Sequence, residues 1–208
     1  MKPYLIIPLM GKRRKNIFKK NNYFLNNKYN YLLNHIFNNF KFCSTIIIIC
    51  RRADRKYLKF RRNFSKVEFV YLKSSKNQIE TILKCKEKIS NENPIFILNP
   101  DSYFKFDKNF KFKQLLKNQT TFFVIRNYES HSALNNKDTF KILNNKIKSI
   151  KIKEGIPDNR QIFVSAGLYF FKNLNIFVNL SQKFKKKISS NKEIQIAHLL
   201  KDPINLSD

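Results

Sequence analysis

The chain has 208 residues, 42% of them hydrophobic, and carries a formal net charge of +28. This length suits one domain with a sizeable core, and the apolar content excludes a disordered basic tail. Lysine far outnumbers arginine and Asn, Ile and Phe are abundant, so part of the charge reflects a bias typical of AT-rich coding. The charge still favours anionic partners, which are nucleotides, nucleic acid or an acidic membrane surface.

The cysteines and the first apolar run indicate the compartment. Cys43, Cys50 and Cys85 are odd in number and form no CxxC pair, which argues against a zinc site and a disulfide framework and fits a reducing cytosol. The apolar run 4–10 is too short to cross a bilayer and lacks a small-residue cleavage site. We therefore expect a cytoplasmic protein without a transmembrane segment.

The first half alternates between strand and helix patterns. Short apolar runs at 4–10, 44–50 and 94–99 predict buried strands, and a further strand is predicted at 66–72. Apolar residues at helical spacing over 32–40 predict a helix, a basic and partly helical connection covers 51–62, and Asn77 with Glu80 marks another helix start. This succession predicts a Rossmann-like α/β/α sandwich with a mostly parallel central sheet and helices on both faces.

The second half predicts more strand. A short helix is expected within 106–117, strands at 120–126 and 162–171, and a hairpin from 139–143 and 146–152 around Asn144-Asn145. Ser190 and Glu193 form a capping box before a last helix. No linker or repeat divides the chain, so we expect a single domain over 1–208, with a nucleotide-binding half at 1–107 and a β-rich substrate half at 108–208.

Two places carry candidate chemistry. Asp101 follows the strand 94–99, and open α/β sheets bind ligands at the carboxyl ends of their strands. A carboxylate there, amid basic residues, suits Mg²⁺ held against phosphate oxygens, although Asp101 could also simply open a turn after Pro100. Gly11 follows the first strand and precedes four cations at 12–15, which fits a phosphate-binding turn or a solvated basic loop.

An ordered series of short motifs resembles the bacterial sugar-phosphate nucleotidyltransferases and covers nearly the whole chain. Ile6-Ile7-Pro8-Leu9-Met10-Gly11 with the basic residues after it resembles that family's opening loop, and Asn99-Pro100-Asp101 resembles its Asn-x-Asp metal motif. The remaining landmarks resemble its Pro-Lys step, its Gly-Gln-x-x-Thr stretch and its later Ser, Glu-Lys and Gly-x-Tyr-x-Phe positions; they are Asn27-Lys28-Tyr29, 77–81, Ser132, Lys153-Glu154 and 165–171.

The resemblance implies a GT-A-type fold and a reaction between a nucleoside triphosphate and a sugar 1-phosphate. The products would be pyrophosphate and a nucleotide sugar for surface polysaccharides, with Mg²⁺ as cofactor. It also implies roles for single residues. Gly11 would approach the nucleotide, Arg14 or Lys15 would neutralise the triphosphate, Lys28 would hold phosphate, Gln78 the base, Asp101 the metal and Glu154 a sugar hydroxyl, and Gly167 would leave room for the sugar ring; Lys15, Lys28 and Asp101 are the expected catalytic residues.

Three alternatives stay open on the sequence. The residues at 12–15 replace a second glycine of the family's loop, and Gly155 stands where the family has a lysine, which favours a non-catalytic relative that binds a nucleotide or sugar phosphate. A GT-A glycosyltransferase usually has an Asp-x-Asp pair, which Asp101-Ser102-Tyr103 does not supply. The basic runs match no nucleic-acid recognition motif, so specific nucleic-acid binding is not expected. The oligomeric state is left open.

Overall fold

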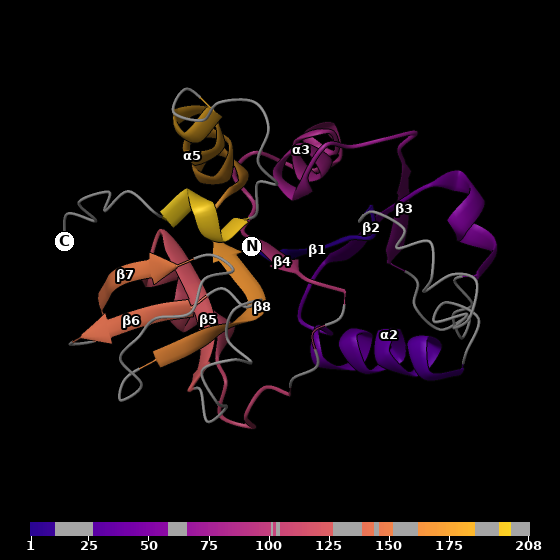
Figure 1. Ribbon diagram of the computed structural model, residues 1–208. Coiled ribbons are helices and arrows are strands. Elements are labelled where there is room, and N and C mark those ends of the chain that lie inside the picture. Colours follow the sequence, from indigo (N-terminus) through magenta and orange to yellow (C-terminus); the bar gives the residue numbers. More distant parts are fainter. Residues whose placement is uncertain are drawn as a thin grey trace.

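The fold is built on one mixed sheet of eight strands (Figure 1). The computed structural model describes residues 1–10, 27–57, 66–100, 102, 105–126, 139–143, 146–151, 162–185 and 196–200. The strand order is β3-β2-β1-β4-β8-β6-β7, and β5 pairs with β8 outside this path.

The parallel part of the sheet comes from the first half of the chain. It consists of β1 (Tyr4–Pro8), β2 (Thr45–Cys50), β3 (Val67–Tyr71) and β4 (Ile95–Leu98), which pair in parallel. All of β4 and all but the first residue of β1 and β2 are buried. Strands covered on both faces need continuous apolar runs rather than alternating ones, as in β1, β2 and β4, whereas β3 lies at the edge of the sheet and is only partly buried. All four predicted strands are confirmed.

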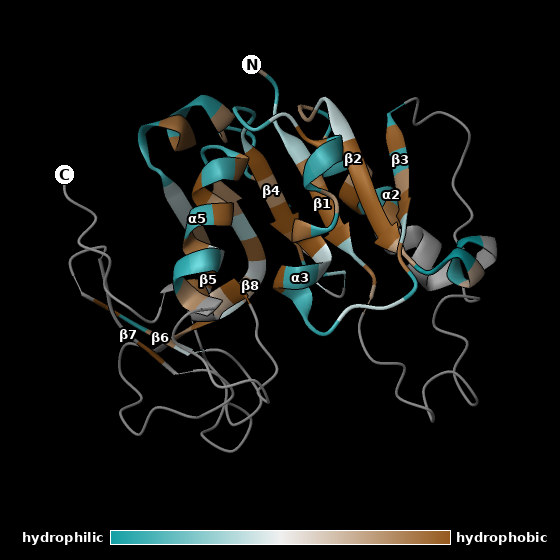
Figure 2. Ribbon diagram, turned by 90° about the horizontal axis from the view of Figure 1, so that it is seen from above, coloured by the Kyte–Doolittle hydropathy of each residue, from teal (hydrophilic) through white to brown (hydrophobic). Residues whose placement is uncertain are grey.

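Helices cover both faces of this sheet, as predicted (Figures 1 and 2). On one face α2 (Asn27–Asn39) packs Leu33 and Phe37 against strand residues such as Ile48. On the other face lie α3 (Gln78–Leu83) and α5 (Leu174–Lys185), whose buried residues include Ile82 and Phe177. Neighbouring residues of one strand point to opposite faces, so each buried strand contributes to both cores.

The antiparallel part comes from the second half of the chain. The long strand β8 (Ile162–Phe171) pairs with β4 on one edge, while β5 (Thr120–Arg126) runs along its other edge. The strands β6 (Thr139–Leu143) and β7 (Lys146–Lys151) form the predicted hairpin, and β6 pairs with the start of β8. The prediction of strands in this half is confirmed.

The helices were predicted less well than the strands. The helix after Asn77 is α-helical only to Leu83 and continues as the 3-10 helix η2 (Lys86–Lys88). Within 106–117 only η3 (Phe112–Lys117) is helical, and η4 (Ile196–Leu200) is the described part of the last helix; η1 (Arg52–Tyr57) begins the basic connection. The helix α5 was missed. No helix in the described ranges is long and apolar enough to cross a membrane.

All three cysteines are free thiols buried in the core. Burial raises the pKa of each thiol, to about 11 for Cys50, where the nearby Asp54 carboxylate adds to the effect, and to about 12 for Cys85. A thiol reacts as its thiolate, so these cysteines should be inert in the folded protein.

We expect a thiol-specific reagent at pH 8 to modify less than one cysteine in the native protein and all three in urea. The pKa values of the thiols are raised in the folded state, so folding favours the neutral thiols. The stability that this provides is present below about pH 8.5, the ordinary thiol pKa, and should be lost as the pH rises toward 11 to 12. Mass spectrometry after timed alkylation and urea titrations at several pH values measure the two effects. Rapid native labelling of Cys50 or Cys85 would contradict this burial.

Candidate functional site

The sheet forks at the carboxyl end of β4. The register pairs Leu98 of β4 with Leu168 of β8, and Thr139 of β6 with Val164 of β8. Residues 165–167 of β8 therefore lie between the two ladders, where β8 leaves β4 and joins β6. We call residues Asn99, Ser102 and 165–167 the fork. It lies at the strand ends where open α/β sheets place ligands.

Gly167 allows the chain after β4 to lie directly against β8. Its φ is +72°, a left-handed conformation that residues with a Cβ rarely adopt. A Cβ at this position would overlap Ser102 Oγ and would lie 3.0 Å from Asn99 Cβ. The Asn99 backbone N–H donates to Gly167 O at 2.7 Å, and the Gly167 N–H donates to Ser165 Oγ at 3.1 Å. The glycine is therefore required by both its backbone conformation and its neighbours.

Asn99 also contacts the first residue of α3. Gln78 Nε2 donates to Asn99 Oδ1 at 2.6 Å. Residue 99 thus binds β8 through its backbone and α3 through its side chain. Two of the residues predicted for the site, Gln78 and Gly167, are therefore brought together by Asn99, which had no predicted role of its own.

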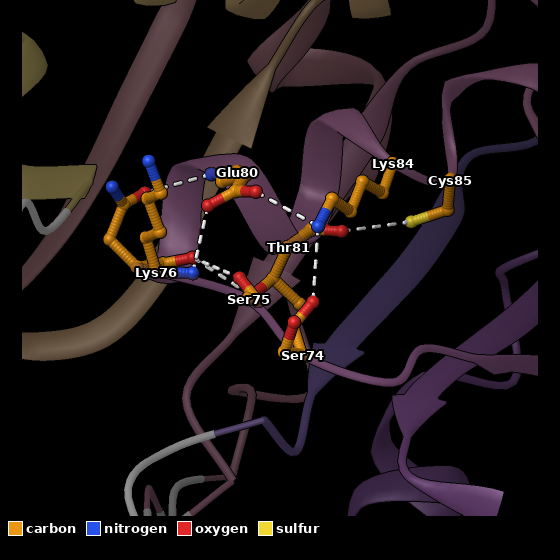
Figure 3. A network of polar contacts seen from close by, with 8 residues as sticks. Ser74, Ser75, Lys76, Glu80, Thr81, Lys84 and Cys85 are labelled. Carbon is orange, nitrogen blue, oxygen red and sulfur yellow. Dashed lines mark hydrogen bonds and ion pairs between the residues drawn. The ribbon is translucent and has the colours of Figure 1, made fainter.

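A polar network fixes the N-terminus of α3 (Figure 3). Asn77 Oδ1 accepts the Glu80 N–H at 2.9 Å, so the predicted N-cap is confirmed. Glu80 Oε2 accepts the Lys76 N–H at 2.8 Å, and Glu80 Oε1 pairs with Lys84 Nζ at 2.9 Å. Both contacts lower the pKa of the Glu80 carboxyl, and the contact with Lys84 has the larger effect. Ser75 Oγ lies 2.6 Å from Thr81 Oγ1. Gln78 therefore projects from a well-anchored helix start.

A second polar pair supports β8 at the fork. Ser165 Oγ lies 3.1 Å from Tyr169 OH, and the Tyr169 residue is only 2% exposed. Because Ser165 Oγ also accepts the Gly167 N–H, this pair holds the backbone on either side of the glycine. A buried hydroxyl is normally hydrogen-bonded, and here its bond stabilises the turn in β8.

The remaining predicted site residues are placed less completely. Lys28 lies in the first turn of α2, and its side chain lies outside the described part of the structure. Gly11, Arg14, Lys15, Asp101 and Glu154 are outside the described residues. The roles expected of these residues beside Gln78 and Gly167 therefore stay predictions. Among the described residues no three His, Cys, Asp or Glu side chains gather as a metal site.

The sequence analysis assigns no individual role to three residues of the fork, which are Asn99, Ser102 and Ser165, or to Tyr169 beside it. A signal for Asn99 was present, because an amide directly after a buried strand is a polar group at the ligand-binding edge. The positions of Ser102 and Ser165 depend on how β4 and β8 pair across about seventy residues of chain, which short motifs do not reveal.

Comparison with known proteins identifies the fold. No family model matches the chain, and no curated protein matches its sequence. A solved structure assigned as a glucose-1-phosphate thymidylyltransferase from Bacillus anthracis is 16% identical, with a TM-score of 0.69 over 96% of this chain and 80% of that one. A UDP-glucose pyrophosphorylase solved with UDP-glucose is 16% identical, with a TM-score of 0.67 over 97% of this chain and 86% of that one.

The name of a third similar structure contains inositol 1-phosphate and CTP instead of glucose and a thymidine or uridine nucleotide. The inositol-1-phosphate CTP transferase from T. maritima is 12% identical, with a TM-score of 0.64 over 97% of this chain and 80% of that one. The chain therefore has the α/β fold of these nucleotidyltransferases, and identities this low show the fold alone.

Replacing Gly167 with Ala should destabilise the protein by about 2 kcal/mol or more, since left-handed strain costs roughly 1–3 kcal/mol and the new Cβ overlaps Ser102. Urea denaturation measures the loss. Adding Ser102→Gly to the same chain removes the overlapping Oγ and should recover part of it. Equal urea midpoints for wild type and Gly167→Ala would contradict this geometry.

Proposed function

We propose that the protein is a sugar-1-phosphate nucleotidyltransferase, which joins a nucleoside triphosphate and a sugar 1-phosphate into a nucleotide sugar and pyrophosphate. The observation that carries the proposal is the fork, where Gln78, Asn99 and Gly167 converge from α3, β4 and β8. These are the positions at which the sequence resembles the base-binding, metal-binding and sugar-binding motifs of that family. The fold shared with such transferases supports the same conclusion.

The reaction makes one bond and breaks one. A phosphate oxygen of the sugar 1-phosphate attacks the α-phosphorus of the triphosphate, and the bond from that phosphorus to the bridging oxygen of the β-phosphate breaks. Pyrophosphate leaves with the electron pair. Such a transfer asks the protein for in-line positioning and for neutralisation of charge, rather than for a covalent intermediate.

In the proposal, residues of the chain position the two substrates and neutralise their charge. Gly11 lets the backbone approach the nucleotide, and Arg14 or Lys15 neutralises the triphosphate. Lys28 holds phosphate, and Gln78 contacts the base. Glu154 binds a sugar hydroxyl, and Gly167 borders the sugar. A chain with a net charge of +28 attracts both anionic substrates.

Mg²⁺ fits the residues around Asp101. Asp101 offers carboxylate oxygens and Ser102, next to it in the chain, offers a hydroxyl oxygen, and hard oxygen donors are the ligands that Mg²⁺ prefers. The three thiols, in contrast, are buried in the core. Asp101 would hold the ion, which would supply neutralisation of the phosphate charge.

The setting of the reaction is part of the proposal. Nucleoside triphosphates are cytoplasmic, and the nucleotide sugar would serve surface polysaccharide synthesis. A second candidate is a non-catalytic relative that binds the same ligands. The specific observation in its favour is the run Lys12-Arg13-Arg14-Lys15, because bulky side chains replace a glycine that a tight phosphate cradle favours.

Replacing Asp101 with Asn should lower pyrophosphate release by about two orders of magnitude or more, which is roughly 3 kcal/mol of transition-state stabilisation. The substitution removes the charge and keeps the shape, so folding should barely change. Binding of nucleotide without metal should be unaffected or slightly stronger, because repulsion between carboxylate and phosphate is relieved. The assay is pyrophosphate release from each of the four NTPs with a panel of sugar 1-phosphates.

The matched control is Asp107→Asn. Asp107 is exposed, and its Oδ1 accepts the Asn109 N–H at 2.7 Å. The amide oxygen of Asn can accept the same N–H, so the rate of the Asp107→Asn variant should equal that of wild type. Equal rates for wild type and Asp101→Asn would remove Asp101 from the mechanism. Nucleotide binding without pyrophosphate release from any pair would favour the non-catalytic relative.

A further inference from the structure

We propose that Asn99 is a positioning residue that joins the nucleotide side and the sugar side of the site, so that both substrates are held in one alignment. The proposal rests on the proposed function and adds to it a role in the reaction for a residue that contacts neither substrate. We refer to the contacts of Asn99 with Gln78 and Gly167 as the Asn99 junction.

The junction uses both polar ends of one residue. The backbone N–H of Asn99 points to β8 and donates to Gly167 O at 2.7 Å. Its side-chain Oδ1 points to α3 and accepts from Gln78 Nε2 at 2.6 Å. A single half-buried residue thus has one short hydrogen bond to each neighbouring element, and a change in either element must move or break a bond at residue 99.

Packing leaves this residue little freedom. Asn99 Cβ would lie 3.0 Å from a Cβ placed on Gly167, and Asn99 Nδ2 would lie 3.2 Å from it. The side chain therefore fills the space above the glycine. The Ser102 N–H also donates to Asn99 O at 3.1 Å, which closes the turn that follows β4. Asn99 is thus held by two segments distant in sequence, at Gln78 and Gly167, and by the turn that it begins.

The two elements joined by Asn99 belong to different halves of the chain. Gln78 lies in the half at 1–107, which would bind the nucleotide, and Gly167 lies in the half at 108–208, which would bind the sugar. An in-line displacement needs the attacking oxygen and the leaving group aligned, and a misplacement of about 1 Å can cost roughly a hundredfold in rate. A rigid connection at the fork would provide this alignment without touching the reacting atoms.

A positioning role and a purely structural role have different kinetic signatures. If the junction aligns two bound substrates, its loss lowers kcat and leaves both KM values nearly unchanged, because an interaction effective only in the transition state is lost. If the junction only stabilises the fold, the folded fraction of the variant retains the kcat of wild type.

The test uses two variants of similar size at one position. Asn99→Leu keeps the bulk of the side chain and removes the acceptor, and should lower kcat about tenfold or more with both KM values within about threefold of wild type. Asn99→Asp keeps an oxygen to accept from Gln78 Nε2 and should keep kcat within about threefold. The control Asn91→Leu, at an exposed turn residue, should match wild type. Rates are measured well below each variant's melting temperature.

A second readout needs no activity. Hydrogen exchange at the Asn99 amide should become at least about fivefold faster in Gln78→Leu, although residue 78 is far from it in the chain, because the side-chain bond restrains residue 99. Asn91→Leu should leave this amide unchanged. Unchanged exchange in Gln78→Leu would overturn the junction, whatever the kinetics.

The two readouts separate the failure of this proposal from the failure of the proposed function. If wild type is active and Asn99→Leu retains its kcat, or if only KM rises, Asn99 is not a positioning residue. If wild type releases no pyrophosphate with any substrate pair, the proposed function and the positioning role fall together. Faster exchange in Gln78→Leu would then show that the junction serves the fold.

Discussion

The close approach of the chain after β4 to β8 at Gly167 is the constraint on which the rest of the structure depends. The two strands run antiparallel and join the parallel sheet of the first half to the strands of the second. Asn99 and Ser102, which follow β4, can lie against β8 only because Gly167 has no side chain and adopts a φ of +72°. This approach brings Asn99 to Gln78 and opens the fork from which β6 departs. One glycine thereby sets both the continuity of the sheet and the place of the site.

Charge contributes little to the stability of the described structure. The described ion pairs are local, between Arg51 and Asp54 and between Lys84 and Glu80. Partly exposed pairs of this kind contribute about 1 kcal/mol or less. The core is instead apolar and aromatic, with Phe96 packed against Phe40, Phe42, Phe112 and Phe170. In the proposed function the excess of lysine acts on anionic substrates.

The sequence predicts the strands well because their burial on both faces leaves continuous apolar runs, as in the Ile46–Ile49 stretch of β2. It predicts the start of α3 from the side chains of Asn77 and Glu80, whose hydrogen bonds are local. It misses α5, where Asn, Ser and Lys interrupt the apolar residues that pack on β8. It also misses the junction at Asn99, because that contact depends on pairing between β4 and β8, which short-range patterns do not encode.

The most direct test of the account is whether ligands bind at the fork. Each of the three glycines follows a different residue type, and only Gly167 follows alanine. A sample labelled with ¹³C-carbonyl alanine and ¹⁵N-glycine therefore gives one peak in a carbonyl-to-amide NMR experiment, from Ala166-Gly167. Titration with NTP and Mg²⁺, then with sugar 1-phosphate, should shift this peak until it saturates, while sodium sulfate at equal ionic strength should not. A stationary peak under conditions where calorimetry shows binding would place the ligands elsewhere and contradict the account.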